Sequence, residues 1–492
     1  MLEYHGSYDY EGVNTSNFIL QNNTTAYNNN LQSSAYLFKN KLVYTNRVFQ
    51  NAALQITGHY VSHQTPQNYF FLPAVYQNEN FTSNTQSSRF KKEYLDFQAN
   101  LVGNRGKKSL IKEDKYEVFL GAVTYTSLFN ANLLGFNTQE SINLDEFENE
   151  QQYKYKSLYG GGNYKLKIRR WKVMTSLKIS YLNQVLEDYS QAKQLVNQRL
   201  LLESNASLSY KIGRWSSLSL GASYLPSPFS EEYFVSNPVL FSPRNISFNE
   251  SSLDISENIS LSGGYSVNDI AGGLRMSFIG TYSLRVGNYF DSFVIQPNST
   301  RTVRFFLPES NTMKGLNVMI EKYIDPIEST IRIQSSYNLM TYFNSIGNEK
   351  LRENNTQMLN NELFFKTAFD IKVNFENTLR YLWSESRTES GERFANQSLM
   401  NTFKIIVKSA EKFFFLLTHD YFLPSLEGES SQISFLDLEG RYITKKSNWS
   451  ISLRNITNVR TFDQISVNDF SSYLYQINLL PRHLLLKYLI RF

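Results

Sequence analysis

The sequence predicts an all-β protein, built as a large antiparallel transmembrane β-barrel. Three observations predict it: side chains alternate between apolar and polar with a period of two, short turns alternate with long loops, and the composition is aromatic yet polar. With Tyr 33 and Phe 36, aromatic residues make up 15% of the 492 residues, whereas the apolar set reaches 41% and mean hydropathy is -0.38. Such a chain is too aromatic to be disordered, and it lacks the run of ~20 apolar residues that a spanning helix needs.

The period-two alternation is clearest over residues 371–383. Because successive side chains of a strand point to opposite faces, this stretch has one apolar and one wet face. The same alternation recurs over 172–181, 207–212, 274–284 and 449–454. In the first stretch the apolar parity carries Ile371, Val373, Phe375, Leu379, Tyr381 and Trp383, and the polar parity carries Lys372, Asn374, Glu376, Thr378 and Arg380.

The connections between these stretches alternate in length. Tracing them gives about 20 strands of ~12–15 residues, longer than the ~5–6 residues usual in soluble strands. Long strands with short turns at one rim and long loops at the other are typical of outer-membrane barrels. A sheet in lipid must close on itself, because lipid offers its backbone no hydrogen bonds. The turns lie near 169–170, 213–214, 268–269, 325–326 and 445–446, and the long polar segments are 184–197, 226–253, 286–312, 342–356, 385–395 and 459–478.

Several other classes of protein are disfavoured. A soluble propeller is the main structural alternative, but it would show a repeat of ~40–50 residues, and the sequence has none. The net charge of +5 is too small to indicate a nucleic-acid partner, and the absence of cysteine excludes disulfides and thiolate metal sites. The first ten residues have no basic or apolar leader segment, which favours a mature or truncated piece of a longer protein.

The last ten residues form a distinctive amphipathic strand. His483, Lys487 and Arg491 share the face expected to look inward. An amphipathic final strand that ends in Phe resembles the signal read by the barrel-assembly machinery of the bacterial outer membrane. The face expected to meet lipid carries Leu484, Leu486, Tyr488, Ile490 and Phe492.

The segment before this strand resembles the closing strands of TonB-dependent receptors. In that family an Asn-Leu-Phe-Asn turn opens the last external loop, and here Asn455-Ile-Thr-Asn458 stands in its place, with Pro481-Arg482 leading into the last strand. Residues 237–240 and 242–244 are similar to a mid-barrel loop of the same group. The resemblance implies a barrel of 22 strands, so residues 1–492 are expected to be one barrel domain, a C-terminal fragment without signal peptide, plug and one hairpin.

The resemblance also implies a function. It is uptake of a scarce solute (a siderophore, oligosaccharide, peptide or similar) across the bacterial outer membrane, with recognition in the external loops. The implied partners are outer-membrane lipid, the barrel-assembly machinery and a TonB-type energy-coupling protein acting through the missing plug. A surface lipoprotein is a further candidate partner. The alternative is a plugless barrel with a structural, adhesive or assembly role, and the upstream coding sequence would discriminate between the two.

Two sets of residues are candidates for contact with a solute or a plug. Charged residues on the inward parity would line the lumen, although for any single residue ordinary mixed-sign packing of the wall is the favoured explanation. Aromatic pairs in the long loops are candidate ligand contacts, or they pack the loops together. The lumen set is Lys165, Lys167, Lys178, Arg275, Arg332, Lys372, Glu376, Arg380, Asp437, Glu439, Arg441 and Arg454, and the aromatic set is Tyr69, Phe70, Tyr233, Phe234, Tyr289, Phe290, Phe305 and Phe306.

No catalytic residues, metal site or cofactor site are predicted. His59 and His63 lie ~13 Å apart on a strand, too far to share a zinc ion. The acidic stretch 145–150 is a candidate calcium site but more typical of a solvated loop. An outer-membrane hydrolase is the third alternative, although no Ser-His-acid constellation is evident. Because side chains cannot fill a barrel of about 20 strands, the chain by itself is expected to enclose an empty, polar, charge-lined channel.

Overall fold

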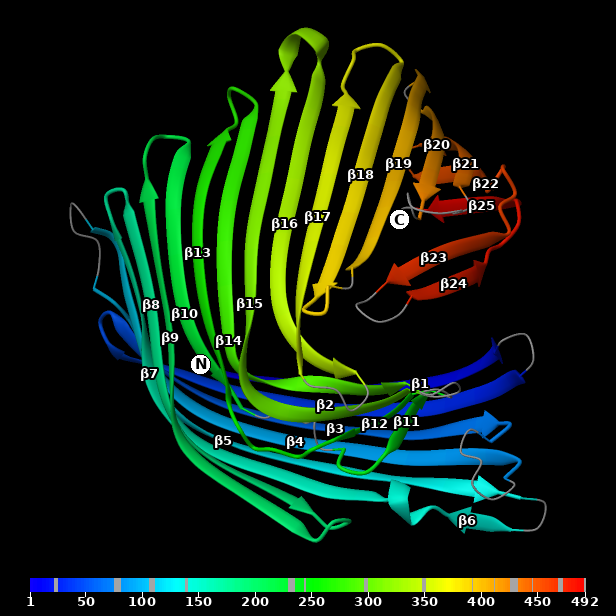
Figure 1. The fold of residues 1–492 in the computed structure, drawn as a ribbon. Coiled ribbons are helices and arrows are strands. Elements are labelled where there is room, and N and C mark those ends of the chain that lie inside the picture. The colour runs from blue at the N-terminus through cyan, green and yellow to red at the C-terminus, as the bar shows by residue number, and fades with distance from the viewer. Residues whose placement is uncertain are drawn as a thin grey trace.

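The computed structural model consists almost entirely of β-strands (Figure 1). It describes residues 1–21, 25–74, 81–105, 111–137, 140–228, 235–242, 245–295, 300–346, 351–391, 393–410, 412–424, 432–444, 446–467 and 472–490. Within those ranges there are two short 3-10 helices, η1 (Asp145–Phe147) and η3 (Asp325–Ile327). None of the described helices has the length and apolar character that crossing a bilayer requires.

Within the described ranges one sheet holds 23 strands, of which β6, β11 and β12 are short loop strands, so that 20 strands form the wall. Each wall strand pairs antiparallel with the wall strands next to it in sequence, as expected for a barrel of hairpins. The prediction of about 20 strands is therefore confirmed.

The bounds of the wall strands are β1 (Leu2–Gln21), β2 (Thr25–Phe49), β3 (Ala52–Leu72), β4 (Ser83–Asn104), β5 (Ile111–Phe136), β7 (Asn149–Ile168), β8 (Trp171–Asp188), β9 (Lys193–Lys211), β10 (Ser216–Ser227), β13 (Ser256–Asp269), β14 (Leu274–Ile295), β15 (Thr300–Ile324), β16 (Ser329–Ile346), β17 (Arg352–Thr367), β18 (Val373–Thr388), β19 (Arg393–Ala410), β20 (Phe413–Leu423), β21 (Ile433–Ile443), β22 (Ser447–Arg454) and β25 (His483–Ile490). The loop strands are β6 (Ser141–Asn143), β11 (Val239–Ser242), β12 (Asn245–Asn249), β23 (Thr461–Val467) and β24 (Ser472–Asn478), the last two forming a separate hairpin.

The connections fall on two rims. Because neighbouring strands run in opposite directions, every second connection lies at the same rim. The predicted turns near 169–170, 213–214, 268–269 and 325–326 share one rim, and β21 ends and β22 begins at that rim. β25 ends at that rim too, whereas Phe492 lies outside the described residues. We call this the turn rim and the opposite end the loop rim.

The strands are longer than the alternation predicts. Four of the six segments predicted as long loops are largely paired strands of the wall: β8 and β9 remain paired up to Asp188 and Lys193, and β14 and β15 up to Ile295 and Thr300. Apolar residues are adjacent in these ends, as in Tyr289-Phe290 and Phe305-Phe306, so no period-two signal marks them. The backbone hydrogen bonds of a ladder do not depend on the side-chain pattern. Long wall connections remain at 228–255 and 455–482.

The sheet curls round but does not close. Among the described residues β1 pairs with β2 alone and β25 with β22 alone, and Figure 1 shows these two edge strands apart on the right of the view. The structure is therefore an open barrel with one seam, between β1 and β25. This opening is wider than the strand count predicts for a nearly closed barrel.

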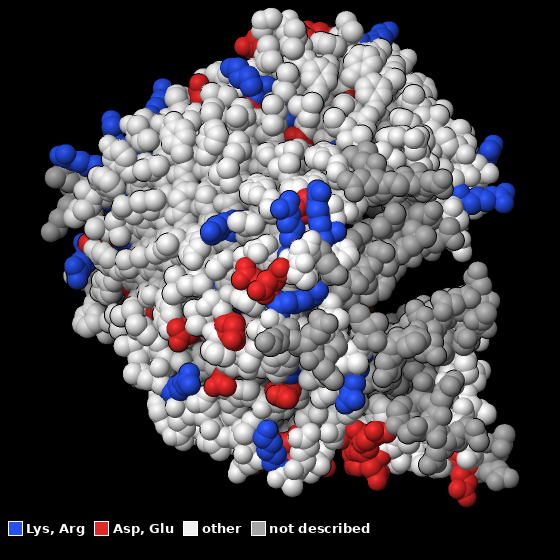
Figure 2. Space-filling view, in the orientation of Figure 1, with Lys and Arg blue, Asp and Glu red and all other residues white. Residues whose placement is uncertain are grey.

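The outer face is a broad apolar band. Leu120 and Leu200 point outward from the middle of the wall and are 70% and 73% exposed, and Trp449 stacks on Tyr488 near the turn rim, with ring centroids 4.0 Å apart. Such a band is typical of a lipid-facing surface, and in water it would promote aggregation. Figure 2 shows that acidic and basic residues are intermingled and that most of the visible surface carries neither.

The buried apolar core lies on the inner face, near the loop rim. Residues 235–242 and 245–255, which we call the strap, follow β10 and fold back over the inner face of β3–β9. In the described residues each of four apolar clusters joins the strap to the wall, for example Leu240 to Phe71 and Leu133. The channel is therefore partly covered at this end, which differs from the expectation that no segment of the chain would occupy it.

Candidate functional site

The register of the ladder defines the inner face. Lys178 lines a wall pocket, and residues paired across strands share a face, so the assignment can be followed from Lys178 to Glu203 and on around the sheet. Of the twelve charged residues predicted to line the lumen, the eleven that lie in strands share this face. The twelfth, Lys372, immediately precedes β18 at the turn rim.

A ladder of alternating charges crosses five strands of this inner face. Glu321 of β15 pairs with Arg275 of β14 at 3.5 Å and with Arg332 of β16 at 3.7 Å. Glu362 of β17 then pairs with both Arg332 and Arg380 of β18, each at 2.8 Å. Because each carboxylate bridges two guanidinium groups, this charge ladder links neighbouring strands on the lumen side of the sheet.

A second charged group lies beside the seam. Arg454 of β22 reaches Asp437 at 2.8 Å and Glu439 at 3.3 Å, and Glu439 also accepts a hydrogen bond from Arg441 at 2.6 Å. Elsewhere Lys165 pairs with Glu113, Lys178 with Glu203, and Glu376 with Lys404. For Lys167, which faces Lys172 across the ladder, and for Lys372 the described residues supply no ion pair. Most predicted lumen charges thus have a structural partner. The partners Asp437 and Glu439 were predicted from the sequence, whereas Glu113, Glu203, Glu321 and Glu362 were not.

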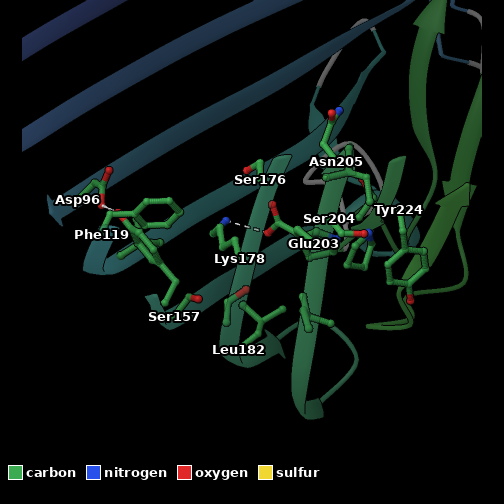
Figure 3. A pocket seen from close by; sticks show the side chains of 18 of the residues that line it. Asp96, Phe119, Ser157, Ser176, Lys178, Leu182, Glu203, Ser204, Asn205 and Tyr224 are labelled. Carbon is green, nitrogen blue, oxygen red and sulfur yellow. Dashed lines mark hydrogen bonds and ion pairs between the residues drawn. The ribbon is translucent and has the colours of Figure 1, made fainter. Parts of the chain in front are cut away.

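The inner wall of β4–β10 is hollowed into a pocket of about 800 Å³ (Figure 3). Tyr159 donates a hydrogen bond to Asp96 at 2.8 Å, and the Lys178 ammonium lies 5.2 Å from the Tyr159 ring centroid. Lys178 also donates to Glu203 at 2.7 Å, as the dashed line in Figure 3 marks. Aromatic faces beside satisfied charges can hold a polar, uncharged solute by stacking and hydrogen bonding.

The close packing of this wall depends on glycine. A Cβ atom on Gly161 of β7 would lie 2.2 Å from the carbonyl oxygen of Leu177 and 2.8 Å from the Phe119 ring. Any larger side chain at this position would therefore push the neighbouring strands apart.

The predicted loop aromatics divide into three groups. Tyr233 and Phe234 lie outside the described residues. Phe290 is 2% exposed and meets Phe343 edge-on at 6.0 Å, so it packs the extended hairpin of β14 and β15. Tyr289 likewise packs, with Phe306 at 5.4 Å.

The remaining aromatic candidates lie on β3 and β15. Phe305 is paired with Phe290 across the β14–β15 ladder. On β3, Phe70 is on the outer parity and 38% exposed, whereas Tyr69 faces inward beside the buried Phe71. Of the described aromatic set, Tyr69 and Phe306 each line a cavity.

The turn that carries the family resemblance is a compact hydrogen-bonded unit. Asn455 and Asn458 adopt φ of 51° and 57°, a left-handed conformation that asparagine tolerates better than most residues. The Asn455 amide group donates to the carbonyl oxygens of Val459 at 2.7 Å and Leu480 at 2.9 Å, which joins the start of the last loop to its end. The Asn458 side chain accepts from the backbone of Arg482 at 3.2 Å. These contacts explain the two asparagines and leave the intervening positions free to vary.

The histidines are not arranged for metal binding. His59 meets Tyr94 edge-on at 5.8 Å, and His63 lies within 3.3 Å of the Thr65 hydroxyl. Residues 145–147, within the acidic stretch, form η1. In the described part of the chain no group of three His, Cys, Asp or Glu side chains is placed to hold an ion.

A buried carboxylate lies near the loop rim, beyond the apolar band. Glu385 of β18 is 3% exposed, and it accepts hydrogen bonds from Arg387 and, at 2.8 Å, from Arg393 of β19. Burial alone would raise the pKa of this carboxyl, but the two arginines outweigh burial and hold its pKa below the usual 4.5. The charged form of Glu385 therefore stabilises this hairpin.

This arrangement predicts a pH-dependent hairpin. A group with a lowered folded pKa stabilises the fold above its unfolded pKa and loses that contribution as pH falls through the folded value. We expect the amides of the β18–β19 tip to lose protection below pH 4.5, by about 1 kcal/mol or less because the arginines are half exposed. Hydrogen exchange, corrected for intrinsic rates, measures this, and Glu385→Gln should remove the pH dependence. An unchanged pH profile in that variant would contradict the assignment.

Comparison with known proteins supports the fold. No protein-family model matches the chain, and no curated protein matches it in sequence. Among solved structures, the chain is similar to the ferric citrate transporter FecA in its unliganded form, with a TM-score of 0.52 and 10% identity over 98% of this chain and 70% of that chain. It is also similar to the siderophore receptor PiuA from Acinetobacter baumannii, with a TM-score of 0.51 and 10% identity over 98% of this chain and 74% of that one. The predicted fold class, a large antiparallel β-barrel, is thereby confirmed.

Proposed function

We propose that this chain is the outer-membrane barrel of a TonB-dependent receptor that imports a scarce solute. The observation that carries the proposal is the pairing of a continuous outward apolar band with a polar, charge-lined inner face on a 20-stranded wall. Lipid around the outer face removes the free-energy cost of exposing this apolar band to water. The polar inner face requires a lumen that is filled by water or by protein. The turn rim would then face the periplasm and the loop rim the outside.

The fold supports a receptor more than it supports a hydrolase. FecA is a ferric citrate transporter and PiuA a siderophore receptor, and this chain shares their fold. The turn at 455–458 and the Pro481-Arg482 pair resemble the corresponding elements of such receptors. We propose that a plug from the same protein fills the lumen and couples it to a TonB-type partner, and that the barrel-assembly machinery recognises the terminal strand.

The charged inner wall supports the proposed plug contact. The ladder from Arg275 to Arg380 and the group around Arg454 present side chains of both signs to the lumen, a surface suited to a polar, exchangeable contact with a domain that must move. The same groups equally suit transient contact with a charged solute.

Location and conductance test the proposal together. We expect the protein in the outer-membrane fraction, as a band whose gel mobility changes on heating, and we expect the 492-residue chain to give a large, steady current in a planar bilayer because its strands enclose more space than side chains can fill. A sealed bilayer despite verified insertion would contradict an open lumen, and recovery in the soluble fraction would contradict the membrane location. A plug-coding segment upstream supports import, whereas a signal peptide directly before Met1 would favour the structural alternative.

A further inference from the structure

The strap and the wall enclose a second cavity, which we call the strap chamber. It lies between the strap and the inner face of β2–β5 and has a volume of about 520 Å³. Small-molecule sites are typically concave, mostly apolar cavities of ~300–1,000 Å³ with a few well-placed polar groups. The apolar walls of the chamber include Tyr69, Phe90 and Phe129 from the barrel and Val235, Val239 and Leu240 from the strap.

The apolar walls are held in fixed positions. Gln86 of β4 accepts a hydrogen bond from the backbone N–H of Leu240 at 2.7 Å and donates one to its carbonyl oxygen at 3.0 Å, so the side chain pairs with the strap as a strand would. Val239 packs with Ala131 in a buried cluster. The chamber is therefore built by specific contacts, and a ligand would not have to order it.

Among the described residues, the charged side chains that line the chamber are of one sign. They are Lys92 and Arg304, and none of the described lining residues is a carboxylate. The Lys92 ammonium lies 4.7 Å from the Phe90 ring centroid, and Arg304 is oriented by Asp291, which stands outside the lining, at 2.6 Å. An apolar cavity with cations at its wall favours a ligand with an apolar body and a negative group.

We propose that the strap chamber binds an organic anion with an aromatic or aliphatic body. The body would lie among Phe90, Phe129 and Val239, and the negative group would accept hydrogen bonds from Lys92 and Arg304. The site deepens the proposed function, on which it rests, by naming the class of solute that the receptor would hold below its loops.

Equilibrium binding to the full chain in lipid nanodiscs tests the site. The probe is 2-naphthalenesulfonate, with the neutral 2-naphthalenemethanol as its matched partner, each titrated by calorimetry. We expect the anion to bind more tightly, and Lys92→Gln and Arg304→Gln each to weaken it about tenfold, as loss of one charge-assisted hydrogen bond implies. Lys92→Arg should restore binding, and Val239→Trp should fill the chamber and abolish it.

The neighbouring lysine provides a matched control. Lys91 is on the same strand but the opposite face and pairs with Glu93 at 2.8 Å, so Lys91→Gln should leave the affinity unchanged. Equal affinity for the two naphthalenes, or unchanged binding in both Lys92→Gln and Val239→Trp, would overturn the proposal. Binding is measured without transport, and location and conductance are measured without ligand, so failure of this site is distinguishable from failure of the proposed function.

Discussion

Leu177→Arg should destabilise the protein by about 2–4 kcal/mol, the cost of an arginine near the middle of a lipid-facing strand. Leu177 points outward from β8 and is 48% exposed. On the same face Trp171 lies toward the turn rim and Tyr181 toward the loop rim, the arrangement that aromatic girdles take at the two membrane interfaces. Urea unfolding in lipid vesicles, followed by tryptophan fluorescence, measures the loss.

The adjacent residue supplies the control for this substitution. Ser176 is next to Leu177 but lines the inner wall pocket, where an added arginine remains wet. Ser176→Arg should therefore change the free energy of unfolding by much less than Leu177→Arg. If the two variants were equally stable, the outer face would not meet lipid, and the proposed membrane location would fail with it.

Leu240→Asp should release the strap from the inner wall. Leu240 is 2% exposed and packs against Phe71, Leu133 and Phe147. A carboxylate there would be buried among apolar side chains, at a cost of about 3–5 kcal/mol, so the strap would detach locally and the rest of the sheet would remain folded. Hydrogen exchange over the strap should accelerate by about 100-fold or more, since each 1.4 kcal/mol is a factor of ten.

A conservative substitution separates the loss of apolar packing from other effects. Leu240→Met keeps the volume and polarity and should cost under about 1.5 kcal/mol, with the strap still protected. Release of the strap should also raise the conductance of the inserted chain. Full protection of the strap in Leu240→Asp would show that other contacts, such as the buried hydrogen bonds of Ser236 with Asp188 and Gln151, hold it without Leu240.

The extent to which sequence predicts structure differs along the chain. Where one face meets lipid and the other does not, the period-two pattern is strong, and it correctly predicted the stretches of β8, β14 and β18. The tight turns were equally clear, because a turn interrupts the pattern on both faces. Beyond the apolar band the pattern disappears, and residues 184–197 and 286–312 were predicted as loops although the ladder continues through them.

The candidate sites were predictable in part. Strand parity correctly assigned eleven charged residues to the inner face, since parity follows from local geometry alone. Their partners, such as Glu321 for Arg332, come from a neighbouring strand whose register depends on the turn between them. The aromatic candidates were chosen by type, and type does not distinguish the buried Phe290 from the cavity-lining Tyr69.

The sequence by itself determined the fold class, the number of wall strands, the rim to which each short turn belongs and the face to which each strand residue points. All of these follow from side-chain alternation and turn chemistry, which act over a few residues. Only the tertiary structure decided that the strap folds inward, that Gln86 pairs with Leu240 and that a chamber with two cations lies beneath them. Those features join residues more than 150 positions apart in the chain, and no local pattern records which distant surfaces will meet.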